Sequence, residues 1–459
     1  MEAGCREGER YAHPRGEPRM CLMTYDEALP ALFTGLAALG IRRPEEILAL
    51  RNIRGTFGLV TRESVEGDVA ATLDSLLSSL GPWANPPGQR LFTSEDLAII
   101  GDVFASPELM HYAPPGSEWE LPILHRLVTG SEWIGASIED HPIRKPPRIV
   151  YYGVKGGVGR STALAVTAYH LARLGKHVLL VDLDLESPGL SGILLPPDTA
   201  WARAKFGVVD YLAETSADPH FAAWSDLVSR SPLENAPSVT GTISVVAAGG
   251  AESPNYLEKL SRAYLEIPMA ETGIAGFTKR IETMLDALVA NLDPRPDAIL
   301  IDSRAGLHDI AAACLVRLAD LGLLFATDAP QTWDDYRILF EHWGKSPIAV
   351  RSIRERLQIV RAMMPGGQAE SRNFSAKSFE LFQGLYDELE PGDLGTEAFS
   401  FAVEDDEAPH SPWLIRFSSD LLEFDPVRGM KTLGPELVQM LHDDFLGKLV
   451  LWLERNAAG

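Results

Sequence analysis

The chain has 459 residues, and its 41 lysines and arginines against 64 aspartates and glutamates give a net charge of −23 at pH 7. This length suits two or three domains, and 46% hydrophobic with 23% charged residues is typical of a globular protein. The acidic excess disfavours nucleic acid or an anionic membrane as a partner, because like charges repel over about 8–10 Å. Cys5, Cys21 and Cys314 form no closely spaced pair, so we expect a reducing, cytoplasmic location and no cysteine-rich metal site.

The first part of the chain divides into a tail and a helical unit. Residues 1–24 are polar and contain no apolar core of a signal peptide, so we expect a disordered tail, in which Met20 or Met23 is an alternative start. Residues 25–145 then predict a mainly helical accessory domain. Helical periodicity occurs at 25–41, 64–81 and 94–105, with one β-prone run at 56–61. The Pro-rich segment 139–148 marks the boundary.

From residue 146 to residue 459, short apolar runs alternate with amphipathic segments. The runs predict strands at 148–154, 177–184, 243–249, 298–303, 321–327, 357–364 and 413–418. Helices are expected near 161–174, 254–266, 275–291, 305–318, 331–344, 377–390 and 433–455. Strands that are apolar on both faces belong in a parallel sheet covered by helices on each side. The fold class is therefore α/β, with a doubly wound, mostly parallel sheet.

A glycine-rich segment follows the first of these strands and leads directly into a helical pattern. It reads Lys155-Gly156-Gly157-Val158-Gly159-Arg160-Ser161-Thr162. Such a turn points several backbone N–H groups at one place, where the helix dipole also favours an anion, so phosphates are the expected ligand. Ser161, in the first helical turn, is suited to bind the Mg²⁺ that bridges nucleotide phosphates. A tight turn without a ligand is the simpler alternative, which the density of glycines, cations and hydroxyls disfavours.

Carboxylates end two of the predicted strands. Asp182 and Asp184 stand two residues apart, so their side chains leave the same side of an extended chain. Asp302 follows four apolar residues, where a carboxylate is costly unless it meets a cation or hydrogen-bond donors. Parallel sheets bind ligands at the carboxyl ends of their strands. A metal site is one explanation of these residues, and a carboxylate pair that caps the following turn is another.

These motifs resemble those of a known family. KGGVGRST resembles KGGxGK[ST]T, the deviant phosphate loop of the ParA/MinD class of P-loop ATPases. Residues 172–190 are similar to the second strand and first switch of that class, residues 298–309 to its Walker B strand and second switch, and residues 321–339 to the next strand and helix. The resemblance implies ATP and Mg²⁺ as cofactors, slow hydrolysis of ATP to ADP and phosphate, and an ATP-dependent homodimer that acts on another molecule.

The resemblance also implies a role for each motif residue. Lys155 is at the position of the signature lysine, which reaches the phosphates of the partner across the dimer; a solvated loop lysine is the simple alternative. Asp184 would position or activate the attacking water, and Asp182 would help to hold the metal and its waters. Metal ligands, directly or through water, would be Ser161, Asp302 and Asp182. Contacts to the nucleotide would come from Gly156, Gly157, Val158, Gly159, Arg160, Ser161, Thr162 and Gly306.

Two departures from the family pattern keep a second function open. Arg160 stands where the family has lysine, and its larger planar group has a different reach, so binding is expected to survive better than hydrolysis. Many relatives carry an Asn after the strand that corresponds to 357–364 to read adenine, and this chain offers Arg361-Ala362-Met363 there. A non-hydrolysing nucleotide-binding scaffold is therefore the alternative to an ATP-hydrolysing switch. Arg304 either senses the γ-phosphate or pairs with Asp309, and the residues leave both open.

The sequence disfavours several of the molecules on which such a switch could act. A DNA-positioning ATPase would need basic surface residues, and a membrane-positioning one would need a basic terminal helix; the helix at 433–455 carries Asp443 and Asp444 and is expected to pack on the core. A tyrosine autokinase would need a C-terminal tyrosine cluster, which this chain lacks. An unidentified protein partner remains, with the N-terminal unit as its expected recognition module. The acidic run 404–407 is either a solvated loop or a dock for a basic partner.

Overall fold

The computed structural model divides the chain into two compact units, residues 1–131 and 132–459. It describes residues 23–100, 102–106, 109–126, 133, 143–195, 203–218, 221–251, 253, 255–265, 267–269, 273–365, 368–387, 398–421 and 435–457. Nearly all of the expected tail, and residues 139–142 of the expected boundary segment, lie outside the described residues.

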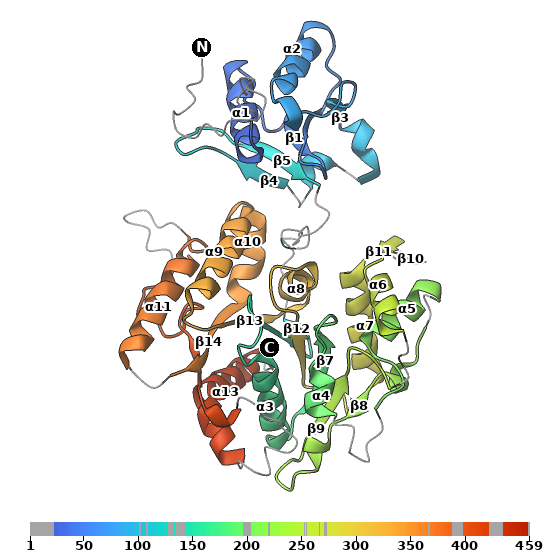
Figure 1. Ribbon diagram of the computed structural model, residues 1–459, viewed down its shortest axis with the longest axis vertical. Helices are drawn as coiled ribbons and strands as arrows, with labels where there is room; N and C mark the ends of the chain where they lie inside the picture. The colour runs from blue at the N-terminus through green and yellow to red at the C-terminus, as the bar shows by residue number, and fades with distance from the viewer. Residues whose placement is uncertain are drawn as a thin grey trace, which may run out of the picture. The chain divides into compact units, whose positions relative to one another are not determined.

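In the first unit, the described residues form a five-stranded sheet and two α-helices (Figure 1). The helices are α1 (Tyr25–Ala38) and α2 (Gly67–Ser78), and the strands are β1 (Ile47–Arg51), β2 (Phe57–Thr61), β3 (Leu91–Thr93), β4 (Leu109–Tyr112) and β5 (Leu121–His125). The strand order is β3-β2-β1-β5-β4, in which β1 pairs antiparallel with β2 and parallel with β5. Apolar residues of α1 and α2 bury one face of this sheet, including Leu32, Leu36, Leu73 and Leu77.

The prediction of a mainly helical first unit is not confirmed, because a five-stranded sheet accompanies its helices. Only β2 was expected as a strand, and the helix expected at 94–105 is instead two short 3₁₀ segments, Glu95–Ile100 and Val103–Ala105. The missed strand β1 is buried at all five positions, because each face of the sheet packs on its own apolar cluster. A short run without alternation cannot be assigned from periodicity alone, so the sequence did not reveal this strand.

The second unit is built on an eight-stranded sheet with the order β15-β14-β13-β6-β12-β7-β9-β8. Its strands are β6 (Arg148–Tyr152), β7 (His177–Leu183), β8 (Ser229–Arg230), β9 (Thr242–Val246), β12 (Ala298–Ser303), β13 (Leu321–Ala326), β14 (Leu357–Met364) and β15 (Trp413–Arg416). All neighbours are parallel except β8 and β9. The seven predicted strands are all present and the α/β prediction is confirmed. Among the described strands of this sheet, the short edge strand β8 was not predicted.

Helices connect the strands of this sheet. They are α3 (Arg160–Arg173), α4 (Leu190–Leu194), α5 (Val208–Ala217), α6 (Tyr256–Ala263), α7 (Phe277–Asn291), α8 (Asp309–Ala312), α9 (Pro330–Gly344), α10 (Pro347–Ile353), α11 (Gln368–Gln383) and α13 (Pro435–Ala457). A π-helical segment, Ala313–Leu318, continues α8, and a hairpin joins β10 (Ile267–Met269) to β11 (Gly273–Ala275). Helices α4, α5 and α10 were not expected, and α11 begins earlier than the predicted 377–390.

Helices cover both faces of the parallel sheet, as two consecutive tyrosines of β6 demonstrate. Tyr151 contacts Phe445 of α13, with ring centroids 6.3 Å apart, and Tyr152 contacts Tyr336 of α9 on the other face at 6.3 Å. Because alternate strand residues point to opposite faces, this requires helices on both sides. The last helix therefore packs on the core, as predicted. No described helix is long and apolar enough to cross a membrane.

Candidate nucleotide-binding site

The glycine-rich loop lies at the carboxyl edge of the sheet, between β6 and α3. Gly157 and Gly159 have φ angles of +73° and +81°, in the left-handed region that favours glycine. At Gly153 a Cβ atom would lie 3.2 Å from Val158 Cγ2 and 3.3 Å from the carbonyl oxygen of Lys155, so the loop folds back closely on itself. Gly156 and Gly157 are exposed at its tip, whereas Val158 is buried below them. This is the shape of an anion cradle in front of a helix N-terminus.

Register brings the strand-end carboxylates together. Asp302 of β12 pairs with Asp182 of β7 and with Tyr151 of β6, so both carboxylates lie on neighbouring strands at the same level. The Ser161 hydroxyl donates to Asp302 Oδ2 at 2.7 Å, while Oδ1 is buried without a hydrogen-bond partner. Burial, with the nearby charge of Asp184, raises the pKa of Asp302 to about 6. The residue thus offers one free oxygen beside the serine of the loop.

Asp182 braces the segment that follows β7. Its two carboxylate oxygens accept the backbone N–H groups of Asp184, at 3.2 Å, and of Leu190, at 3.1 Å. The side chain is fully buried, and burial together with the neighbouring Asp302 raises its pKa well above the ordinary value. Both oxygens therefore already have donors, which fits the turn-capping interpretation more directly than the metal interpretation.

Arg160 contacts both segments that are similar to the family's switches, at Asp184 in the first and at Ser303 in the second. Its buried guanidinium donates to the carbonyl oxygen of Ser303, at the end of β12, and lies 3.5 Å from Asp184 Oδ2. The other oxygen of Asp184, Oδ1, is buried without a hydrogen-bond partner. Burial raises the pKa of Asp184 and the adjacent Arg160 opposes that rise. Arg160 therefore binds protein groups beneath the loop.

Lys155 and the second switch have partners within the chain. The Lys155 ammonium pairs with Asp335 of α9 at 2.5 Å, and its side chain is 43% exposed. Gly306 has a φ of +86° and donates its N–H to the carbonyl oxygen of Gly153 at 3.2 Å, which brings the second switch against the start of the loop. Tyr152 donates its hydroxyl to the Gly306 carbonyl at 3.2 Å.

Arg304 has a partner that the sequence did not indicate. It forms an ion pair with Glu186 in the first switch, and Tyr264 donates its hydroxyl to the same carboxylate at 2.7 Å. This cluster links the first switch, the second switch and the end of α6. Glu186 was visible in the motif ESPG, but nothing in the linear sequence pointed to Tyr264 or to Asp335 as members of the site.

A small pocket adjoins the loop on the side of Thr162. It is lined by residues of the loop, of β14, of β15 and the segment after it, and by His442 of α13: Val158, Gly159, Thr162, Met363, Ile415, Arg416, Phe417, Ser418, Leu421 and His442. Met363 has the unusual φ of +52° at the end of β14. Arg361 is instead buried, with its guanidinium over the ring of Phe374 at 5.0 Å. Of Arg361, Ala362 and Met363, the three residues found where the family has its adenine-reading Asn, only Met363 lines this pocket.

The residues at the loop fit a magnesium ion. Mg²⁺ takes oxygen ligands and keeps several waters, so proteins bind it through one or two side chains together with nucleotide phosphates. The Ser161 hydroxyl and the unpartnered Asp302 Oδ1 supply such oxygens. The described part of the chain holds no cluster of three or more His, Cys, Asp or Glu residues that could bind a metal by themselves. The cation would therefore depend on the phosphates of a nucleotide.

A phosphate loop at the carboxyl edge of a parallel sheet, with its serine bonded to the aspartate of a neighbouring strand, defines the class of P-loop NTPases. Residues 147–215 match the family described as cellulose biosynthesis protein BcsQ. Over 49 residues the chain is 51% identical to the chromosome-partitioning ATPase Soj of Thermus thermophilus. These 49 residues make up 11% of this chain and 20% of Soj. These matches confirm the resemblance to ParA/MinD-type P-loop ATPases. The chain spans about a fifth of the length of that curated relative.

Several solved structures are similar to this chain, with sequence identities of 15–20%. The match to the ParA family ATPase from Chlorobium tepidum covers 66% of this chain and 98% of that ATPase, with 15% identity and a TM-score of 0.42. MinD from Pyrococcus horikoshii complexed with Mg-ADP covers 66% and 95%, with 17% identity and a TM-score of 0.39. The pNOB8 ParA bound to nonspecific DNA covers 68% and 98%, with 20% identity and a TM-score of 0.38. All three scores are below 0.5, so the class assignment rests on the sheet order and the loop.

Proposed function

We propose that this chain is an ATP-binding and slowly ATP-hydrolysing molecular switch that forms a nucleotide-sandwich homodimer and controls a protein partner. The observation that carries this proposal is the contact between Ser161 and Asp302 beneath a preformed anion cradle, with one buried carboxylate oxygen left without a partner. A buried carboxylate oxygen without a donor is costly, and a bound cation is the partner that would remove this cost.

Bound Mg²⁺–ATP would supply the phosphoryl group and neutralise part of its charge. The backbone N–H groups of Gly156 to Gly159 and the N-terminus of α3 would bind phosphate oxygens, with Thr162 beside them. Ser161 and Asp302 would hold the cation. Asp184, which keeps one free oxygen at the end of β7, would orient a water molecule, and Asp182 would keep the first switch in place through its two backbone hydrogen bonds.

Lys155 and Gly306 would act at the mouth of the site. Lys155 is partly exposed and its pairing with Asp335 is a surface ion pair, which contributes little to stability and breaks readily. It is therefore available to reach a second copy of the chain. Gly306 contacts the first residue of the loop through its N–H, so a shift of the loop would be transmitted to the second switch.

Turnover is tested by phosphate release from the full chain with Mg²⁺ and ATP, and dimerisation by light scattering with and without ATP. We expect measurable turnover that Asp184→Ala abolishes, and ATP-dependent doubling of mass that Lys155→Ala abolishes. An exposed lysine outside the site, Lys279→Ala, is the matched control and should change neither. A wild-type mass that is independent of ATP would remove the dimer from the proposal.

The second candidate function is a nucleotide-binding scaffold that does not hydrolyse ATP. It is favoured by Arg160, whose guanidinium is engaged with Ser303 and Asp184 instead of lying in the loop. ATP binding by calorimetry without any phosphate release would support this candidate. Arg160→Lys separates the two: a rise in turnover means that the arginine limits hydrolysis, whereas turnover in the wild type that Asp184→Ala abolishes eliminates the scaffold.

A protein partner, a cytoplasmic location and a recognition role for the first unit belong to the same proposal. The charge of −23 supports a protein partner over nucleic acid or membrane. Retention of the full chain on DNA or on anionic vesicles at about 150 mM salt would contradict this part of it. The proteins that co-purify with the Asp184→Ala form, which is expected to stay dimeric, would identify the partner.

A further inference from the structure

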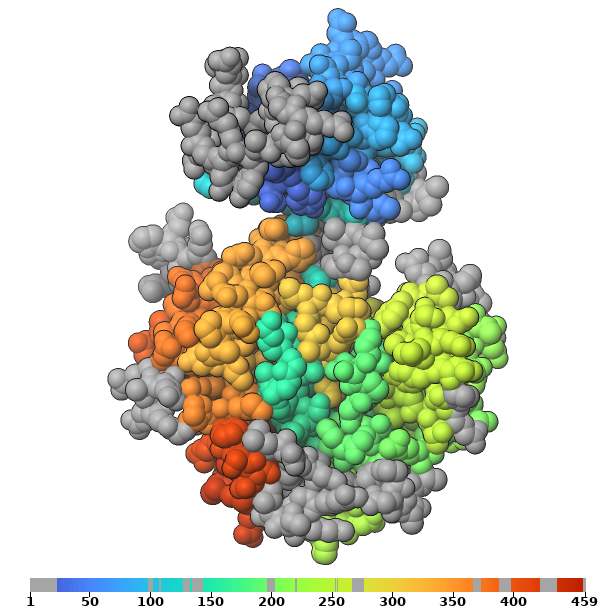
Figure 2. Space-filling model, in the orientation of Figure 1, coloured from blue at the N-terminus to red at the C-terminus, as the bar shows by residue number. Residues whose placement is uncertain are grey.

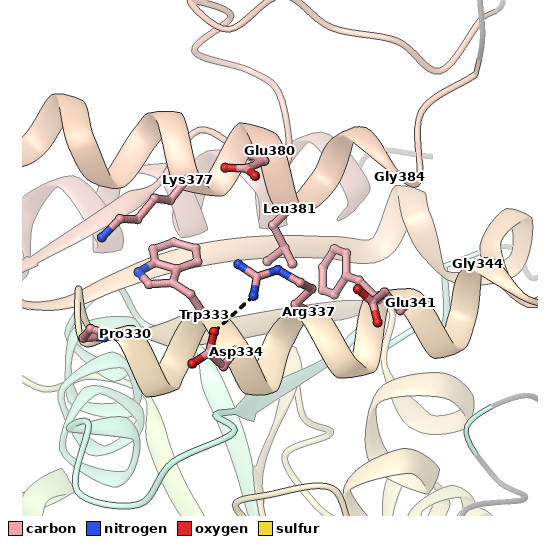
Figure 3. A pocket seen from close by; sticks show the side chains of 11 residues that line it. Pro330, Trp333, Asp334, Arg337, Glu341, Gly344, Lys377, Glu380, Leu381 and Gly384 are labelled. Carbon is pink, nitrogen blue, oxygen red and sulfur yellow. Dashed lines mark hydrogen bonds and ion pairs between the residues drawn. The ribbon is translucent and has the colours of Figure 1, made fainter. Parts of the chain in front are cut away.

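A groove on the second unit runs between α9 and α11 (Figure 3). It has a volume of about 570 Å³. One wall is formed by residues of α9 from Pro330 to Gly344, and the other by Lys377, Glu380 and Leu381 of the second half of α11 and by Gly384 just after it. The lining residues of α9 recur every three or four positions, so the groove follows the whole helix, about 20 Å at 1.5 Å per residue. Figures 1 and 2 show both helices side by side at the surface, in orange.

Aromatic contacts hold the two helices apart at a fixed distance. Trp333 of α9 packs edge-on against Phe374 of α11 with ring centroids 4.8 Å apart, and Phe340 packs against Phe382 at 5.0 Å. These rings form a rigid floor, and Leu381 points across the groove from α11 toward α9 (Figure 3). The groove is therefore preformed and partly apolar.

The charges on the groove do not cancel. Arg337 pairs with Asp334 at 3.0 Å, and Lys377 pairs with Asp328 at 2.7 Å, so both cations of the lining are already neutralised. Glu341 on one wall and Glu380 on the other are exposed and have no hydrogen-bond or ion-pair partner among the described residues. The remaining field over the groove is negative from both sides.

We propose that this groove binds a helical segment of a partner protein that carries apolar side chains along one face and lysine or arginine beside them. The α9 wall, about 20 Å long, has the length of three to four turns of helix. The apolar side chains would contact Trp333, Phe340 and Leu381, and the basic side chains would lie between Glu341 and Glu380. The inference deepens the proposed function, because it states the chemistry of the controlled partner, but it requires neither ATP hydrolysis nor dimerisation.

Binding is tested with fluorescent helical peptides and the full chain, without nucleotide. The probe is a peptide of about 18 residues with leucine along one face and lysine beside it; a second peptide replaces every lysine by glutamate, and a third has a central proline. We expect only the first to bind in fluorescence anisotropy at about 150 mM salt. Stronger binding of the glutamate peptide would overturn the charge assignment, and equal binding of the proline peptide would overturn the helical one.

Variants locate the binding site. Glu341→Lys with Glu380→Lys should weaken the lysine peptide at least about tenfold, because two carboxylates become cations facing it. The matched control is Glu214→Lys with Glu258→Lys, which makes the same change in net charge at exposed residues of α5 and α6 and should change affinity less than about twofold. Equal weakening in both pairs would mean nonspecific attraction to the acidic chain and would overturn the proposal, as would no binding at about 100 µM.

A second readout keeps the result independent of variant folding. Hydrogen exchange of the wild-type chain with the lysine peptide should slow in α9 and α11, and it should stay unchanged in α5 and α6. Protection confined to other elements would refute the site. Leu381→Gln, at a half-buried position of the wall, should weaken the peptide severalfold while the thermal melting of the chain stays the same. Because no nucleotide is present, these outcomes are distinct from failure of the ATPase proposal.

Discussion

Without nucleotide, the folded chain loses stability when the buried Asp302 carboxyl ionises, and Asp302→Asn should remove this pH-dependent loss. Asp302 is 2% exposed, and burial raises its pKa from the ordinary 3.8 to about 6. Because the folded pKa is above the unfolded one, the folded state binds the proton more tightly. The stability that this provides is complete below pH 3.8 and is lost as the pH rises through 6. The shift corresponds to a loss of at most about 3 kcal/mol at pH 8.

Asparagine has the same shape as aspartate and can keep the hydrogen bond with Ser161, but it does not ionise. The stability advantage of the variant over the wild type should therefore grow as the pH rises from 3.8 to about 6, and it should stay near its maximum of about 3 kcal/mol up to pH 8. The assay is urea unfolding at four pH values in the presence of EDTA, followed through the transition of the second unit. The difference between the two proteins cancels other groups that titrate in this range, such as His170, His410 and His442, whose pKa values burial lowers.

Asp302→Asn, which should stabilise the nucleotide-free chain, should also remove the stabilisation that the wild type gains from nucleotide. Mg²⁺ and ATP should raise the melting temperature of the wild type and leave that of Asp302→Asn nearly unchanged, because the free carboxylate oxygen is gone. Asp443→Asn, at an exposed position of α13, is the matched control and should reproduce the wild type in both experiments. If the stability difference between wild type and Asp302→Asn did not change with pH, the reasoning about the buried carboxylate would be refuted.

Three further substitutions test other contacts. Asp335→Asn releases Lys155 and should tighten ATP-dependent dimerisation by about two- to fivefold in analytical ultracentrifugation; unchanged affinity would mean that the ion pair does not compete with the dimer. Phe445→Ala removes a fully buried ring that contacts Tyr151, Phe325 and Trp413, and should lower the free energy of unfolding by about 3–5 kcal/mol in urea. Tyr264→Phe removes the hydroxyl bonded to Glu186 and should speed hydrogen exchange in the switches, at a cost of about 1 kcal/mol.

Local sequence patterns were enough to predict most of the strands of the second unit. The runs around β6, β7, β12 and β13 are apolar at nearly every position because helices cover both faces, and that texture is visible without any knowledge of partners. The loop was equally visible, since left-handed backbone at Gly157 and Gly159 requires glycine in the sequence itself. The sheet of the first unit was not visible, because its strands are short and β1 pairs with β5 about seventy residues later.

The sequence by itself determined the phosphate loop, the strand-end carboxylates and the parallel sheet that brings them to one edge, because each depends on neighbouring residues or on a repeating pattern. Tertiary structure alone decided what the charged side chains bind: Arg160 the Ser303 carbonyl and Asp184, Lys155 the Asp335 carboxylate, and Arg304 the Glu186 carboxylate. It also decided which two acidic residues of α9 and α11 face one groove. A long charged side chain can reach many partners, and only the packing of distant segments selects one.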